Sequence, residues 1–147
     1  MPRYEKDTDT LLNEIRDSKE PADIEGFLAR NVGELVRPLH EYLGDLLRER
    51  HLEKQDVIRR SRLERSYAYH IFSGDRPNPS RPKLLAIALA MGLGLPEVQY
   101  LLRYAGHGIL YPRSPWDSVI ITAIEQGMSV DEANALLEQL GSRQLVG

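Results

Sequence analysis

Apolar residues recur at spacings of three and four along most of the chain, which is the period of an α-helix with one buried face. No stretch of strict apolar and polar alternation is long enough to indicate a strand. The pattern predicts helices over 8–16, 21–29, 38–51, 54–61, 64–72, 81–91, 96–105, 114–127 and 130–140. The sequence therefore predicts an all-α fold.

Turn residues separate these segments. Gly74 is expected to end the helix predicted over 64–72. The segment 75–81 holds two prolines and an asparagine and is expected to be a loop. Ser129, followed three residues later by Glu132, fits the capping box of the last helix. We divide the chain into an N-terminal helical extension (1–37), a central domain (38–94) and a C-terminal helical region (95–147).

The charge of the chain is unevenly distributed. The whole sequence carries a formal net charge of −3, yet 48–83 holds 10 basic and 5 acidic residues. A local basic surface attracts phosphates whatever the global sum. The charge alone is equally compatible with a solvated, salt-bridged helix pair.

Several classes of protein are disfavoured. The chain has no cysteine, which excludes disulfides and thiolate chemistry and suits a reducing compartment. The first nine residues have no signal-peptide core, and the longest apolar run, 84–93, is too short to span a bilayer. It predicts a buried core helix. We expect a cytoplasmic protein without membrane contact.

No catalytic or cofactor motif is evident. The four histidines, at 40, 51, 70 and 107, lack the short spacings of a metal site. The glycine pairs at 92/94 and 106/108 lack the third glycine of a dinucleotide loop and follow no predicted strand. We expect neither an enzyme nor a bound cofactor or metal.

The two short helices predicted over 54–61 and 64–72 are joined by a brief turn, so they must pack at a large angle, as in a helix-turn-helix. The neighbouring sequence has a recognisable order: LLRERHL (46–52), KQDVIRR (54–60), ERSYAYHIFSG (64–74), NPS (78–80) and LLAIA (84–88). These segments resemble the lambda-repressor-like, or XRE, family of helix-turn-helix regulators, over about 55 residues.

The resemblance implies a lambda-repressor-like helix-turn-helix bundle with N- and C-terminal helical extensions. Three positions depart from the family pattern: Ile58 stands where alanine is common, Ser61 where a bulky apolar residue is usual, and Arg62 where the turn often has glycine. A positive φ at Arg62 would cost some conformational energy.

The resemblance makes 64–72 the recognition helix. If Ala68 and Ile71 face the core, the helical period leaves Ser66, Tyr69 and His70 outward. Arg65 lies in the first turn, where recognition helices contact base edges. We predict that Arg65, Ser66, Tyr69 and His70 contact bases.

Phosphate contacts are predicted for basic and polar residues around this helix. Lys54 and Gln55 begin the preceding helix, whose N-terminus favours a phosphate. The complete predicted set is Lys54, Gln55, Arg62, Arg76, Arg81 and Lys83. Glu64 is expected to cap the recognition helix or to act as its first-turn acid rather than to contact a base.

Two hypotheses about function follow. The first is a sequence-specific transcriptional regulator that binds double-stranded DNA, with a homodimer as one option. The second is a protein-interaction adaptor or antitoxin-like partner that reuses the fold. The arrangement with flanking helices is similar to that of bacterial regulators that often accompany protein kinases, so a kinase is one candidate partner. Surplus apolar residues in the N-terminal helices and after Leu95 leave room for a dimer or partner surface.

Overall fold

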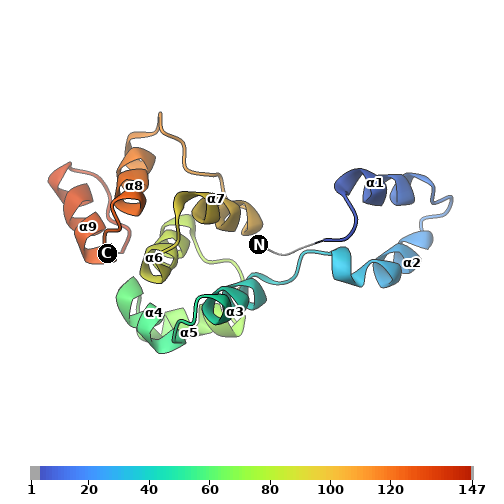
Figure 1. Ribbon diagram of the computed structural model, residues 1–147, viewed down its shortest axis with the longest axis horizontal. Coiled ribbons are helices and arrows are strands. Elements are labelled where there is room, and N and C mark those ends of the chain that lie inside the picture. The colour runs from blue at the N-terminus through green and yellow to red at the C-terminus, as the bar shows by residue number, and fades with distance from the viewer. Residues whose placement is uncertain (1–3, 147) are drawn as a thin grey trace. The chain divides into compact units, whose positions relative to one another are not determined.

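The computed structural model describes residues 4–146, which contain helices and no strand (Figure 1). The α-helices are α1 (Thr8–Arg16), α2 (Asp23–Arg30), α3 (Leu39–Glu49), α4 (Lys54–Ser61), α5 (Arg65–Ser73), α6 (Arg81–Met91), α7 (Leu95–Tyr104), α8 (Pro115–Glu125) and α9 (Val130–Gln139). The all-α prediction is confirmed. A short 3₁₀ helix, η1 (Val32–Glu34), occupies the turn expected after α2.

The helix ends follow the predicted capping chemistry. Ser129 and Glu132 form the expected capping box at the start of α9. Gly74 and Gly92 end α5 and α6 with φ values of +93° and +70°, in the left-handed region that favours glycine. Because these signals lie in the local sequence, the observed bounds differ from the predicted ones by at most two residues at each end.

The chain divides into two compact units, 1–37 and 38–147. The N-terminal unit contains α1, α2 and η1. Its described buried side chains are Phe27 and Asn31. The Asn31 amide donates to Glu14 and accepts from Lys6, so the buried polar group is satisfied.

The second unit is organised around α6. Every residue of α6 from Leu84 to Met91 is buried, as the apolar run predicts. Helices α4, α7 and α9 pack against it, and Leu101, Ile120 and Leu137 from the C-terminal helices belong to the same core. Residues 95–146 therefore share one core with the predicted central domain.

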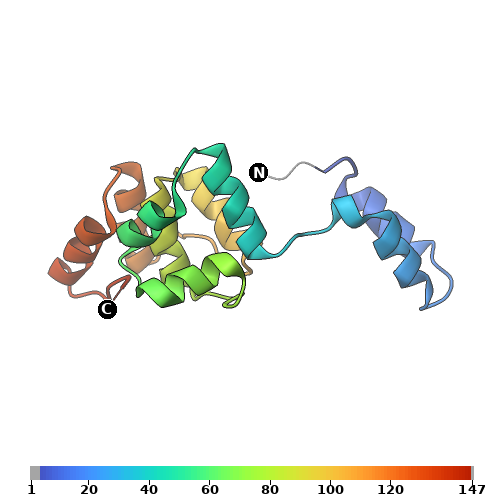
Figure 2. The same cartoon turned by 90° about the horizontal axis from the view of Figure 1, so that it is seen from below.

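Helix α5 packs on this unit through one face only. Ala68, Ile71 and Phe72 are buried, and α3 and α4 are its main neighbours. In two perpendicular views α5 lies at the edge of the unit, with its other face turned outward (Figures 1 and 2). The predicted orientation of Ala68 and Ile71 is confirmed.

The end of α5 gives a stability prediction. A Cβ at Gly74 would lie 2.8 Å from Nδ1 of His40, whereas a Cβ at Gly92 would meet nothing within 4 Å. Both glycines have positive φ, so Gly92→Ala should cost about 1 kcal/mol from backbone strain alone. Gly74→Ala should cost about 2–3 kcal/mol because it adds a steric clash.

Urea unfolding followed by the fluorescence of Trp116, the single tryptophan, measures both values. Equal costs for the two variants would show that the contact between Gly74 and His40 does not constrain the end of α5.

Candidate nucleic-acid interface

Helices α4 and α5 are joined by a tight turn with Arg62 in the left-handed conformation, at φ +61° and ψ +10°. Glycine adopts this conformation without steric cost, and an arginine does not. The turn therefore has the positive φ that glycine would supply, at a position where the sequence has a long cationic side chain instead.

Ser61 supports this turn from inside the core. Its side chain is fully buried, and its hydroxyl donates to the Ile58 carbonyl at 2.6 Å and accepts from the Leu63 N–H at 3.3 Å. A polar residue is tolerated at this buried position because both of its hydrogen-bonding roles are satisfied within the turn.

Glu64 caps α5, as predicted. Its carboxylate accepts the N–H groups of Ser66 at 3.0 Å and Tyr67 at 2.8 Å. These backbone hydrogen bonds, that of Tyr67 first, hold the pKa of Glu64 below its ordinary value. The Glu64 carboxylate therefore caps the N-terminus of α5, next to Arg65.

The outward face of α5 carries the four residues predicted to contact bases. Arg65, Ser66 and His70 are exposed, and Tyr69 is half-buried. Two cations lie over the Tyr69 ring, with Lys54 Nζ and Arg65 Cζ each 5.7 Å from its centroid. The ring therefore links the start of α4 to the start of α5.

A groove of about 540 Å³ lies between the outward sides of α4 and α5. Its lining combines three arginines with polar and apolar groups: Gln55, Asp56, Ile58, Arg59, Arg62, Leu63, Arg65 and Tyr69. Asp56 is paired with Arg59 at 3.1 Å. The remaining charge of the lining is positive, so the groove suits an anionic ligand.

A second cationic cluster surrounds Tyr67. Lys83 Nζ lies 4.2 Å from the centroid of this ring and Arg76 Cζ lies 5.6 Å from it. The half-buried ring thus brings together two predicted phosphate-binding residues from the loop after α5 and from α6.

His70 is held at the other end of α5. Its Nδ1 lies 3.1 Å from Asp75 Oδ2, and this bond, followed by one from Ser73, lowers the pKa of Asp75. The neighbouring carboxylate places a negative charge at this end of the outward face, whereas Arg65 and Lys54 make the other end positive.

Arg62 makes a long-range ion pair. Its Nε and Nη2 donate to the carboxylate of Asp131, at the start of α9, with the Nη2 bond at 2.8 Å. Both side chains are more than half exposed, so solvent screens the pair and it contributes little stability. The local sequence pattern does not predict this contact.

Arg81 is directed into the second unit. Its guanidinium forms a bidentate pair with Asp117 at 2.8 and 2.9 Å and also donates to the carbonyls of Gly108 and Ile109. Arg81 was predicted to bind phosphate, but its N–H groups instead hold the loop between α7 and α8.

The structure also identifies a residue that the predicted set omits. Arg59 lines the groove one turn after Gln55 on α4. The four-residue spacing of these two side chains puts them on the same helical face, and that spacing was the available signal in the sequence.

Two further features bear on the chemistry of the described residues: groups that could bind a metal ion and helices that could cross a membrane. Within 4–146 there is no group of three or more His, Asp or Glu side chains that could hold a metal ion. In the same range no helix has the length and apolarity needed to cross a membrane.

Comparisons with models of protein families, with curated proteins and with solved structures give no significant match.

The Arg81–Asp117 pair gives a second stability prediction. Only 8% of the Asp117 side chain is exposed. Burial raises the pKa of Asp117, but bonds from Arg81 and the Tyr111 N–H outweigh it, and the pKa lies below its ordinary value. Asp117→Asn should destabilise the protein by about 2–3 kcal/mol at neutral pH, because it removes the carboxylate that balances the charge of the part-buried Arg81.

A depressed folded-state pKa stabilises the protein above the ordinary carboxyl pKa, and this stability is lost as pH falls through the folded-state value. The gap between the wild type and Asp117→Asn should therefore narrow below about pH 4. Urea unfolding across pH measures the gap. Asp56→Asn, which breaks the exposed Asp56–Arg59 pair, is the control and should cost about 0.3 kcal/mol. A gap that widens in acid would contradict the assignment.

Proposed function

We propose that the protein is a sequence-specific DNA-binding regulator that uses α4 and α5 as a lambda-repressor-like helix-turn-helix. The observation that carries the proposal is the concentration of positive side chains around the outward face of α5 in a chain of net negative charge. Electrostatic attraction to phosphates needs such a local surface rather than a basic protein overall.

In the proposed complex α5 lies in the major groove. Arg65 reads a base through its guanidinium, for which guanine O6 and N7 are the matched acceptors. Tyr69, which Lys54 and Arg65 both approach, presents an apolar ring edge and a hydroxyl beside the same base step. Ser66 and His70 contact the adjoining positions.

Phosphate contacts flank α5 on two sides. Lys54, Gln55 and Arg59 at α4 contact one strand, where the α4 N-terminus adds its positive dipole end. Arg76 and Lys83, gathered on Tyr67, contact the backbone on the other side. Arg62 exchanges Asp131 for a phosphate at small cost because its ion pair is exposed. Arg81 takes no part in the proposed interface.

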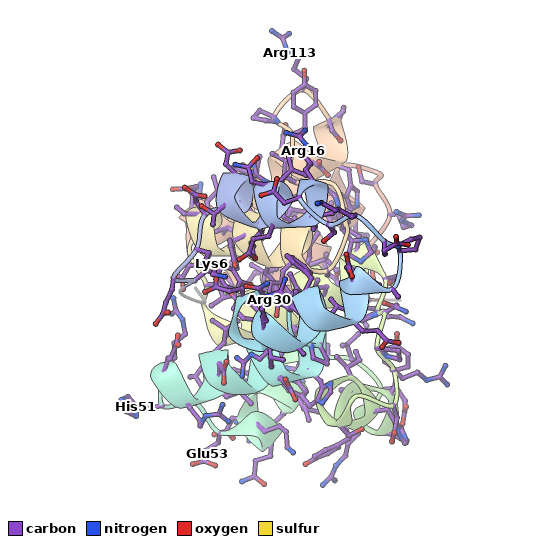
Figure 3. The ribbon with its side chains drawn as sticks, turned by 90° about the vertical axis from the view of Figure 1, so that its right-hand side faces the viewer. Lys6, Arg16, Arg30, His51, Glu53 and Arg113 are labelled. Atoms are coloured by element: carbon purple, nitrogen blue, oxygen red, sulfur yellow. The ribbon has the colours of Figure 1, made fainter. Side chains whose placement is uncertain are left out.

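Removal of the Arg65 side chain should weaken binding to the preferred sequence. A duplex selected from a random pool is titrated with the wild type and with Arg65→Ala. Loss of a bidentate base contact should cost about 1–3 kcal/mol and should relax the preference at one base pair. Arg113→Ala removes an equal charge at the end of the second unit remote from His51 and Glu53 (Figure 3) and should change affinity less than twofold or so.

Equal affinity of Arg65→Ala and the wild type for the selected duplex, with the preference retained, would refute the assigned reading face. Retention of a stoichiometric protein partner without any DNA selection would favour the adaptor alternative.

The salt dependence of binding separates phosphate contacts from base contacts. Arg59→Ala should weaken binding to all sequences alike, because Arg59 is assigned to the backbone, and should reduce the slope of log affinity against log salt by about 1. Fluorescence anisotropy at four or more salt concentrations measures this slope. An unchanged slope for Arg59→Ala would remove Arg59 from the proposed phosphate contacts.

A further inference from the structure

The N-terminal unit exposes most of its large apolar side chains. Seven of the ten exposed large hydrophobic residues in the described chain belong to it: Tyr4, Leu12, Ile15, Ile24, Leu28, Val32 and Val36. Within its described residues, Phe27 is the buried apolar side chain. Segments shorter than about 40 residues rarely stabilise a fold alone, so this surface calls for a covering partner.

Four of these residues belong to α1 and α2, and we define them as the apolar stripe: Leu12, Ile15, Ile24 and Leu28. Leu12 and Ile15 are three apart on α1, and Ile24 and Leu28 are four apart on α2, so each pair shares a helical face. A hollow of about 320 Å³ beside the stripe is lined by Ile15, Pro21, Ile24 and Phe27 together with Ser18, Lys19 and Glu20. It offers space for an apolar side chain from a partner.

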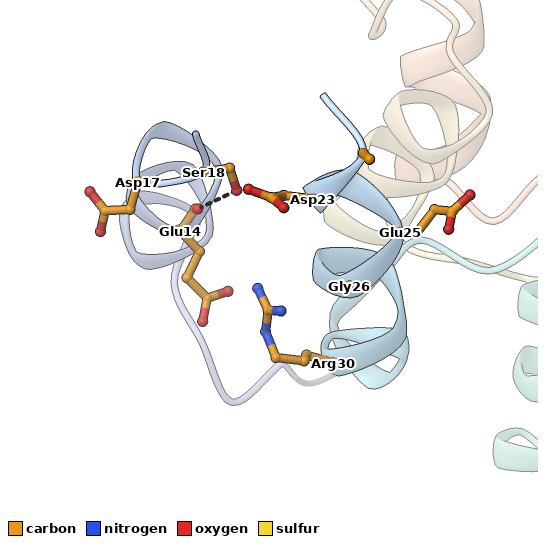
Figure 4. A pocket seen from close by; sticks show the side chains of 8 residues that line it. Glu14, Asp17, Ser18, Asp23, Glu25, Gly26 and Arg30 are labelled. Carbon is orange, nitrogen blue, oxygen red and sulfur yellow. Dashed lines mark hydrogen bonds between the residues drawn. The ribbon is translucent and has the colours of Figure 1, made fainter. Parts of the chain in front are cut away.

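A different hollow between the helices is polar and does not serve this purpose. Figure 4 shows Arg30 extending from α2 toward Glu14 on α1, with Asp23 directed toward Ser18. Charged side chains from both helices line this cleft, so it gives no apolar partner a place to dock.

The charges beside the stripe are arranged for pairing with a second copy. Asp9 lies in the first turn of α1 and Arg16 in its last turn, three residues before and four residues after Leu12. Among residues 4–146 neither makes an ion pair. When two α1 helices lie antiparallel across Leu12, Asp9 of each faces Arg16 of the other.

We propose that the N-terminal unit is a dimerisation element in which the apolar stripes of two copies cover each other. The interface is isologous, because one surface pairs with itself about a two-fold axis. The opposite charges at the two ends of α1 then form two identical ion pairs and fix the antiparallel direction. The second unit exposes only three large apolar side chains, Ile109, Tyr111 and Leu140, among the described residues, and so offers little apolar surface in return.

The first test is the oligomeric state of the full chain without DNA, so its result is independent of the proposed DNA binding. Sedimentation equilibrium over about 1–100 µM should show a monomer–dimer equilibrium. Leu12→Glu and Leu28→Glu should each raise the dimer Kd by about tenfold or more, because a charge enters an apolar interface. Leu140→Glu places the same charge at an exposed leucine outside the stripe and should leave Kd unchanged. Circular dichroism confirms that helix content is retained.

The second test exchanges the charges. Asp9→Arg and Arg16→Asp should each weaken the dimer about threefold to tenfold, and the two together should restore wild-type Kd within about twofold. Each change also opposes the macrodipole of α1. If the two changes acted only by weakening α1, their effects on the dimer Kd would add in the double variant. Ion pairing between the two copies instead predicts that the double variant recovers the wild-type Kd. An equimolar mixture of the two single variants should form a heterodimer.

A chain that stays monomeric at the highest concentration would overturn the proposal. A dimer that is insensitive to Leu12→Glu and Leu28→Glu would do so too, as would a double charge variant weaker than either single one.

Discussion

The burial of α6 is the constraint on which the second unit depends. A helix that is apolar on every side from Leu84 to Met91 has no face to offer to water, so it must be enclosed by other helices. Helices α4, α7 and α9 enclose it. Because α4 is one of these and holds α5 through a short turn, the enclosure of α6 also determines which side of α5 remains outside.

The C-terminal helices thus support the proposed DNA interface structurally. They complete the shell around α6, and they reach the interface through the exposed pair between Arg62 and Asp131. Arg81 and Asp117 fasten the loop between α7 and α8 to the start of α6. One core therefore supports both the proposed recognition helix and the region that follows it.

The helices and their buried faces could be predicted from the sequence because the determinants are local. Periodicity, Gly74, Gly92 and the Ser129 cap specify them with little tertiary information. Contacts between distant residues could not be predicted in this way. Arg62 and Asp131 are 69 positions apart, and nothing in the local pattern distinguishes this pair from other exposed charges.

The candidate site was likewise predicted only as far as local sequence determines it. The helical period was enough to predict the outward positions of Ser66 and His70 on α5, and Arg65 was predicted from its place in the first turn. The helical period could not show that Lys54 and Arg65 both approach the Tyr69 ring, because that arrangement depends on how α4 crosses α5. Nor could the basic character of Arg81 reveal that it is turned inward, since this follows from the path of the loop after α7.

In the proposed function the outward face of α5, with the groove beside α4, contacts DNA. Chemical-shift mapping by NMR, as the selected duplex is titrated into the full chain, tests it most directly. The proposed interface predicts that the largest shifts occur at Arg65, Ser66 and Tyr69 and at the start of α4, with α8 unaffected. Shifts confined to α8, α9 or the N-terminal unit, or no shifts at a saturating DNA concentration, would contradict it.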